Sequence, residues 1–123
     1  MTRLTRPRRR VAALLLPAVL SLAAAGCGND TTSHRTIAAA KVEGGNGFSP
    51  TSISVHTGDK VDLRVSNRTA TAHGFDIDGY GLKKWVIEPG QTQRIRFTAR
   101  RAGTFRIFCH LHPKHQTATL RVL

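Results

Sequence analysis

The sequence predicts an all-β domain, an antiparallel Greek-key β-sandwich of seven or eight strands. Short runs of alternating apolar and polar residues recur along residues 41–123, and turn-forming residues such as glycine, proline, asparagine and aspartate separate them. No segment sustains a helical period of apolar residues for three turns. Short, evenly spaced strands of this kind are typical of two packed antiparallel sheets.

The expected strands follow one another with short turns between them. Two of the turns are Thr57-Gly58-Asp59 and Glu88-Pro89-Gly90, whose residue types favour chain reversal. A core built from about 80 residues is small, so a bound metal would add usefully to its stability. The apolar positions that define the strands are Ile53 and Val55, Val61 to Val65, Phe75 and Ile77, Trp85 to Ile87, Ile95 and Phe97, Phe105 and Ile107, and Leu120 and Val122.

Residues 1–26 have the features of a secretory signal peptide. Five arginines precede a 15-residue apolar run that contains Pro17, and small residues then lead to Cys27. The run is shorter than the roughly 20 residues that a membrane-spanning helix needs, so we expect export rather than a permanent span. The residues before Cys27 resemble the lipobox of bacterial lipoproteins, although Ala24 stands where leucine is more usual. The Arg9-Arg10 pair leaves both twin-arginine and general secretion open.

Lipidation of Cys27 would make the protein a cell-membrane lipoprotein that faces the periplasm or the cell exterior. Residues 27–40 are polar and small and are expected to form a flexible tether, with the folded domain at 41–123. A disulfide between Cys27 and Cys109 is the default in an oxidising compartment, but lipidation removes that option. Cys109 would then be a single thiol in an exported protein, which favours metal ligation.

The charge of the chain is strongly positive. Five of the 19 basic residues and none of the seven acidic ones lie in residues 1–26, so the rest of the chain carries 14 basic and seven acidic residues, a net charge of +7. The basic residues alternate with apolar ones, as on a solvated strand face, and no nucleic-acid-binding motif is present. We therefore expect no nucleic-acid partner; an anionic membrane or an acidic redox partner suits this charge.

A cysteine and three histidines fall within seven residues at the end of an expected strand. Phe105 and Ile107 face the core, so alternation turns Cys109 inward and His110 outward, and His112 and His115 follow in the loop. The best source of a further imidazole is His73, which opens another strand just before Gly74. One thiolate and two imidazoles with a weak axial group form the pattern of blue-copper sites.

Other readings of these residues remain open. One thiolate with three imidazoles is also a suitable tetrahedral set for zinc, although copper is favoured. His34 and His56 are expected to be solvated surface side chains.

Residues 48–122 resemble a cupredoxin. The segments that carry the resemblance are FSPTSISVHTGDKVDLRVSN, HGFDIDGYG and VIEPGQTQRIRFTARRAGTFRIFCHLHPKH, followed by a closing strand. The ligand loop resembles that of amicyanin-type proteins, which implies Cys109, His112 and His73 as copper ligands and His115 in place of the axial methionine. The only methionine, Met1, leaves with the signal peptide.

The segments HGF and EPG also look like subunit II of cytochrome oxidase and nitrous oxide reductase. Those two-copper centres use two cysteines and this loop has one, so a binuclear centre is not expected. The resemblance thus implies one copper ion that cycles between Cu(I) and Cu(II) in a monomeric electron carrier, not an enzyme, that serves a redox partner. An axial imidazole favours Cu(II) and a lower reduction potential. The alternatives are a protein that stores copper or delivers it to an acceptor such as an exported oxidase, or a small copper oxidoreductase.

Overall fold

The computed structural model describes residues 12–13 and 31–123, which form nine strands. The expected cleavage site and Cys27 lie outside the described residues, as does nearly all of the expected signal peptide 1–26. Among the described residues no helix is long and apolar enough to cross a membrane. The strands are β1 (Thr32–Val42), β2 (Gly45–Ser49), β3 (Ser52–Val55), β4 (Lys60–Asn67), β5 (His73–Ile77), β6 (Trp85–Ile87), β7 (Thr92–Thr98), β8 (Gly103–Phe108) and β9 (Ala118–Val122).

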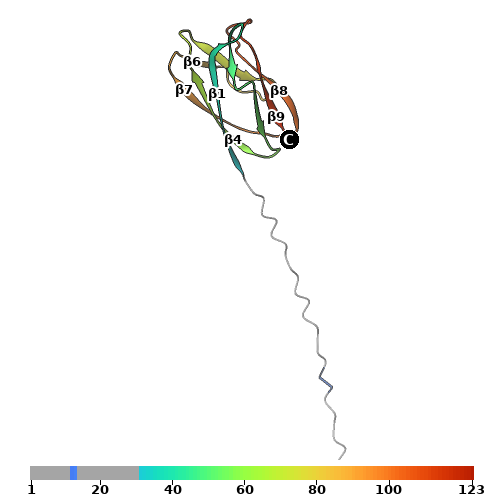
Figure 1. Cartoon of the computed structure of the whole chain (residues 1–123). Coiled ribbons are helices and arrows are strands. Elements are labelled where there is room, and N and C mark those ends of the chain that lie inside the picture. Colours follow the sequence, from blue (N-terminus) through green and yellow to red (C-terminus); the bar gives the residue numbers. More distant parts are fainter. Residues whose placement is uncertain (1–11, 14–30) are drawn as a thin grey trace, which may run out of the picture.

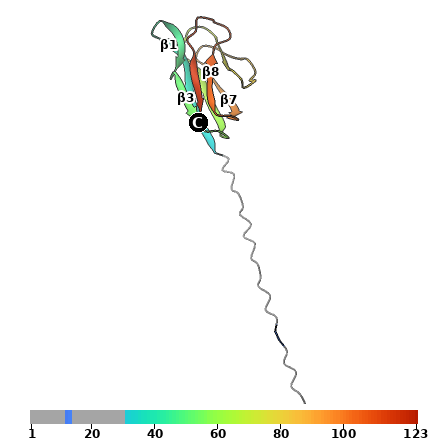
Figure 2. The same cartoon turned by 90° about the vertical axis from the view of Figure 1, so that its right-hand side faces the viewer.

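Two sheets pack against each other and confirm the predicted all-β sandwich (Figures 1 and 2). One sheet has the strand order β2-β1-β4-β7 and the other β3-β9-β8-β5-β6. Most neighbouring strands are antiparallel, but β1 pairs with β4 and β3 pairs with β9 in parallel. Side chains alternate with a period of two in both kinds of pair, so the sequence pattern alone could not reveal the parallel ones.

Strand β1 corrects the predicted tether. Residues 32–40, expected to be flexible, belong to a strand that pairs with β4 on one edge and with β2 on the other. The side chains of Ile37 and Ala39 are buried at 0% and 2% exposure. The small residues of this segment suggested a linker, but pairing on both edges decides its conformation because β propensity depends strongly on context. The folded domain therefore begins at Thr32 rather than at residue 41.

The core lies between the two sheets and reaches up to the histidine-rich loop. Phe48 of β2 and Phe75 of β5 are fully buried and meet edge to face, with ring centroids 5.7 Å apart. The ring of Phe48 also meets that of His115, at a centroid distance of 4.5 Å. The floor of the loop is therefore rigid, apolar and closely packed.

The segments that carry the expected ligands meet at one end of the sandwich. The loop after β8, the first residue of β5 and the turn between β1 and β2 all border one surface pocket. Strand β1 starts at the opposite end, near the C-terminus of the chain (Figure 1). The expected metal site and Thr32, the first residue of β1, are thus separated by the length of β1.

Candidate metal centre

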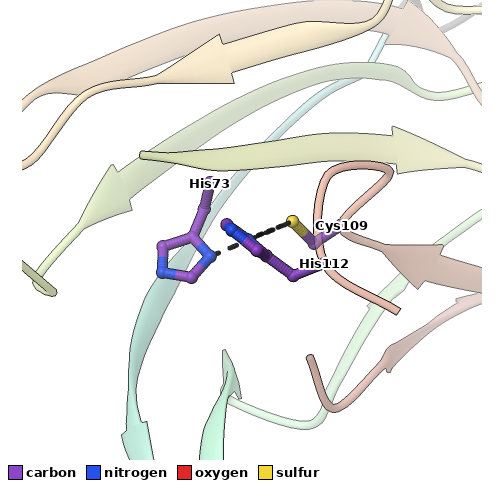
Figure 3. A group of neighbouring side chains, drawn as sticks. All are labelled: His73, Cys109 and His112. Carbon is purple, nitrogen blue, oxygen red and sulfur yellow. Dashed lines mark hydrogen bonds between the residues drawn. The ribbon is translucent and has the colours of Figure 1, made fainter. Parts of the chain in front are cut away.

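Three donor atoms of Cys109, His73 and His112 come together at this end of the fold (Figure 3). The three atoms all lie within 4.8 Å of one another. The Sγ atom of Cys109 is 3.5 Å from Nδ1 of His112 and 3.9 Å from Nδ1 of His73. Ligands held at about 2.0–2.3 Å from one metal ion in a trigonal or tetrahedral arrangement lie roughly 3.5 Å apart. The spacing and the donor types therefore fit a single metal ion.

The thiol and the first imidazole are buried, and the second imidazole is exposed. His73 has 1% and Cys109 has 5% of its surface exposed, whereas the His112 side chain reaches solvent. Cys109 directly follows β8 and points inward, in phase with buried Ile107, as alternation predicts. The set thus consists of two donors held in the interior and one at the surface.

Hydrogen bonds to neighbouring residues orient the two buried donors. The backbone N–H of Gly74 donates to Cys109 Sγ at 3.1 Å, which stabilises negative charge on sulfur. Nε2 of His73 lies 3.4 Å from the hydroxyl oxygen of Thr71; with Nε2 as the donor, Nδ1 keeps its lone pair for a metal. Burial, and secondarily the nearby His112, lower the pKa of His73 below its usual value. Its imidazole is therefore neutral near pH 7, the form that binds metals.

His115 is buried beside the three donors and has an unsatisfied nitrogen. Its ring lies 4.7 Å from that of His73, measured between centroids. Nδ1 lies 3.1 Å from the carbonyl oxygen of Gln116 and so acts as the donor, which leaves the lone pair on Nε2. Nε2 is buried and has no hydrogen-bond partner. Burial, followed by the charge of His73, lowers the pKa of His115 to about 4.

His115 does not supply any of the three donor atoms that lie within 4.8 Å of one another. An unsatisfied buried nitrogen costs about 1–3 kcal/mol, and a metal ion is one partner that would remove this cost.

His110 is not freely exposed, although alternation turns it away from the core. Its side chain is half-buried, and its Nδ1 is buried without a hydrogen-bond partner. The reason is that the ring of His110 lies against Gly74 of the neighbouring strand β5, which covers part of it. By contrast, His34 and His56 have side chains that are 72% and 74% exposed, as expected.

The sequence analysis missed the contribution of the β1–β2 hairpin to the site. The backbone N–H of Gln116 donates to the Asn46 carbonyl at 2.9 Å, and its side-chain amide donates to the Glu43 carbonyl at 2.6 Å. These bonds hold the hairpin against the ligand loop. Gly44-Gly45 was a usable signal for this hairpin, because two glycines in a row favour a two-residue turn. The pocket between the hairpin and the loop has a volume of about 350 Å³ and is lined by Gly44, Gly45, Asn46, His73, His112, Lys114 and His115.

The chain is similar to known copper proteins and oxidase subunits. The family model of the cupredoxin-like domain matches residues 11–122. Subunit 2 of cytochrome c oxidase from Thermus thermophilus is 30% identical over 64 residues, which are 52% of this chain and 46% of that protein. The chain thus matches just under half the length of this relative.

Several solved structures share the fold. Auracyanin A, a blue copper protein from Chloroflexus aurantiacus, has a TM-score of 0.61 and 18% identity; the match covers 75% of this chain and 99% of that one. A copper nitrite reductase from Nitrosomonas europaea has a TM-score of 0.64 and 21% identity, over 75% of this chain and 41% of that one. The neighbours thus include an enzyme as well as a small blue copper protein. At these identities the likeness to solved structures concerns the fold alone. Because the family model spans nearly the whole chain, this chain belongs to the family of cupredoxin-like domains.

Proposed function

We propose that this chain is an exported, mononuclear copper protein that carries single electrons. The observation that supports this most directly is the set of one thiolate and two imidazoles, with Cys109, His73 and His112 already within 4.8 Å of one another. A thiolate with two imidazoles in a trigonal arrangement is the ligand set of blue-copper electron-transfer sites. The described residues contain one cysteine, which supports a single copper ion rather than a thiolate-bridged pair.

His115 is proposed as the fourth residue that would hold the copper ion. Its buried Nε2 has a free lone pair and lies on a ring packed against that of His73. The chemistry that copper supplies when bound is a one-electron change between Cu(I) and Cu(II). An imidazole is a stronger donor than a thioether and would favour Cu(II), so we expect a reduction potential below that of a site with methionine in place of His115.

The protein contributes a rigid setting and one exposed ligand. The hydrogen bond that Cys109 Sγ accepts from Gly74 and the one that His73 Nε2 donates to Thr71 hold these ligands in place whether or not an electron is present. His112 is exposed and borders the open pocket, so its ring edge offers a direct contact for a redox partner. Four protein donors would leave no coordination position for a substrate, which supports a carrier rather than an enzyme.

A role in storing copper or delivering it to an acceptor in the cell envelope is the second candidate. It is favoured by the exposure of His112 and by the pocket above it, through which an acceptor's ligands could reach the site. A small copper oxidoreductase is a third and weaker candidate, because it would need an open metal position.

Export and a lipid anchor on Cys27 are also part of the proposal. Only residues 28–31 separate Cys27 from β1. Strand β1 has 11 residues, or about 35 Å at roughly 3.3 Å per residue, and the metal site lies at its far end. An anchor at Cys27 would therefore turn the copper end of a monomeric domain away from the membrane, toward a partner in the periplasm or outside the cell. Mass spectrometry of the purified membrane fraction tests the lipid on Cys27.

The visible and paramagnetic-resonance spectra of the purified protein with Cu(II) added test the copper site. We expect a copper–thiolate charge-transfer band that disappears in Cys109→Ser. An unchanged band in that variant would refute the thiolate assignment, and tighter binding of zinc with no band on adding Cu(II) would refute copper. Reversible one-electron voltammetry with retained metal supports a carrier, whereas rapid transfer of Cu(I) to a chelator supports delivery.

A further inference from the structure

Gly74 and His110 make an unusually close contact next to the metal site. A Cβ atom on Gly74 would lie 2.6 Å from both Cε1 and Nδ1 of the His110 ring and 3.0 Å from its Cγ. Gly74 does not have a positive φ angle, so its backbone conformation does not require glycine. Glycine in a strand interior weakens the strand and often marks a close approach by another group. The space taken by the His110 ring therefore explains the glycine.

The register between β5 and β8 accounts for this contact. Asp76 pairs with Phe108 and Ile77 pairs with Ile107, and the ladder ends there. Continuing the same register by two residues puts Gly74 opposite His110. The ring of His110 thus covers the glycine across the strands, in the way that an aromatic side chain stabilises a facing glycine. Through this contact β5 and the residues after β8 stay together beyond the last ladder pair, next to the ligands His73 and Cys109.

We propose that His110 is a positioning residue that holds the Gly74 N–H on the Cys109 sulfur and shields this hydrogen bond from water. The inference rests on the proposed copper site. Gly74 directly follows the ligand His73, His110 directly follows the ligand Cys109, and the N–H to Sγ distance is 3.1 Å. On the β6 side Gly74 is paired with Val86, whereas on the β8 side the ladder has ended and the His110 ring limits how far the Gly74 N–H can move relative to the sulfur.

The expected consequence is a higher reduction potential than the same ligands would otherwise have. Hydrogen bonds to the cysteine sulfur and the exclusion of water both tune a copper–thiolate centre. A hydrogen bond to sulfur favours the reduced state, in which the sulfur carries more negative charge. Water near the site favours the oxidised state, which has the higher net charge. Removing the His110 ring weakens the hydrogen bond and admits water, so both effects lower the potential.

The positioning role of His110 depends on the shape of its ring and not on its polarity, because the buried ring nitrogen makes no hydrogen bond. Nδ1 is buried with no hydrogen-bond partner, which is unfavourable for a nitrogen that serves stability alone. A phenyl ring would fill the same space without this penalty. His110→Phe should therefore preserve the positioning role, whereas His110→Ala should remove it.

The test compares voltammetry and visible spectra of the copper-loaded variants. We expect His110→Ala to lower the potential and shift the charge-transfer band, and His110→Phe to keep both close to the unmodified protein. The control is His56→Ala, whose side chain is 74% exposed. Equal potentials in His110→Ala and this control would overturn the inference.

A double-mutant cycle in the metal-free protein tests the contact independently of copper. Gly74→Ala should lower the melting temperature sharply, because its methyl group meets the His110 ring. In the His110→Ala background the same change should cost much less, because the three atoms nearest to the methyl group all belong to that ring. Additive effects would refute the contact even if the unmodified protein shows the copper band. Strong coupling without any copper band would instead refute the copper site, and with it the tuning role.

Discussion

Replacing His115 by leucine should stabilise the metal-free protein and weaken its hold on copper. The His115 ring is buried at 5% exposure, and its Nε2 has no hydrogen-bond partner. With a pKa lowered to about 4, the ring is neutral at pH 7.5, so the orphaned atom is a lone pair in an apolar setting. Leucine has a similar size and brings no polar atom.

The expected size of the effect follows from the hydrogen bonds that change. Removing the orphaned nitrogen relieves a cost of about 1–3 kcal/mol, while the lost bond from Nδ1 to the Gln116 carbonyl contributes about 0.5–1.5 kcal/mol. That carbonyl still accepts the backbone N–H of Phe48 at 3.3 Å, so no new orphan arises. The free energy of unfolding of the metal-free protein should therefore rise by about 1 kcal/mol.

Urea unfolding with and without copper measures both effects. A ligand at 100 times its Kd stabilises a protein by about 2.7 kcal/mol, and a tenfold loss of affinity removes about 1.4 kcal/mol of this. His115→Leu should thus raise the midpoint of the metal-free protein and reduce the gain on adding copper, while His115→Met should retain more of that gain. If the metal-free variant is less stable than the unmodified protein, then Nε2 is satisfied in solution. An unchanged copper spectrum would exclude His115 as a donor.

Three further changes test the fold. Ile37→Ala should lower the free energy of unfolding by about 2–5 kcal/mol, because Ile37 is fully buried in β1; a negligible change in urea unfolding would contradict the strand. Phe48→Ala should cost about 3–5 kcal/mol and also alter the Cu(II) spectrum through the Phe48–His115 contact. Asp62→Asn should destabilise the protein at pH 7, because hydrogen bonds from Arg94 lower the Asp62 pKa from 3.8 to about 2. A carboxylate with a lowered pKa stabilises the fold above its unfolded pKa, so the difference from the unmodified protein should shrink as the pH falls from about 4 to 2; a constant difference would contradict this.

Strands with one buried face could be predicted from the sequence. Val61, Leu63 and Val65 alternate with polar residues and are all buried in β4, because each packs into the core on one side of the sheet. Strand β1 could not be predicted in this way. Its consecutive residues Ile37, Ala38 and Ala39 are all buried, so this part of the strand lacks the alternation by which a strand with one buried face is recognised.

The local part of the candidate site could also be predicted, and the long-range part could not. The spacing of Cys109 and His112 lies within one loop and is visible in the sequence, and the inward direction of Cys109 follows from the strand before it. The half-buried His110 and the bonds of Gln116 to the β1–β2 hairpin depend on which distant segment lies opposite. One residue's shift in register would exchange the faces, and no property of the loop itself reveals that register.

The uneven burial of the donors bears on whether the site carries electrons or delivers copper. Delivery requires an acceptor to replace the ligands one at a time, and this exchange can begin only at His112, the one exposed donor of the three. The next step must displace Cys109 and His73, which are both buried. Cys109 accepts a hydrogen bond from Gly74, and His73 donates one to Thr71. A carrier needs only the exposed edge of His112 and a shell that does not rearrange between oxidation states. The same hydrogen bonds that slow ligand exchange reduce that rearrangement, so we expect fast, reversible voltammetry together with slow release of Cu(I) to a chelator.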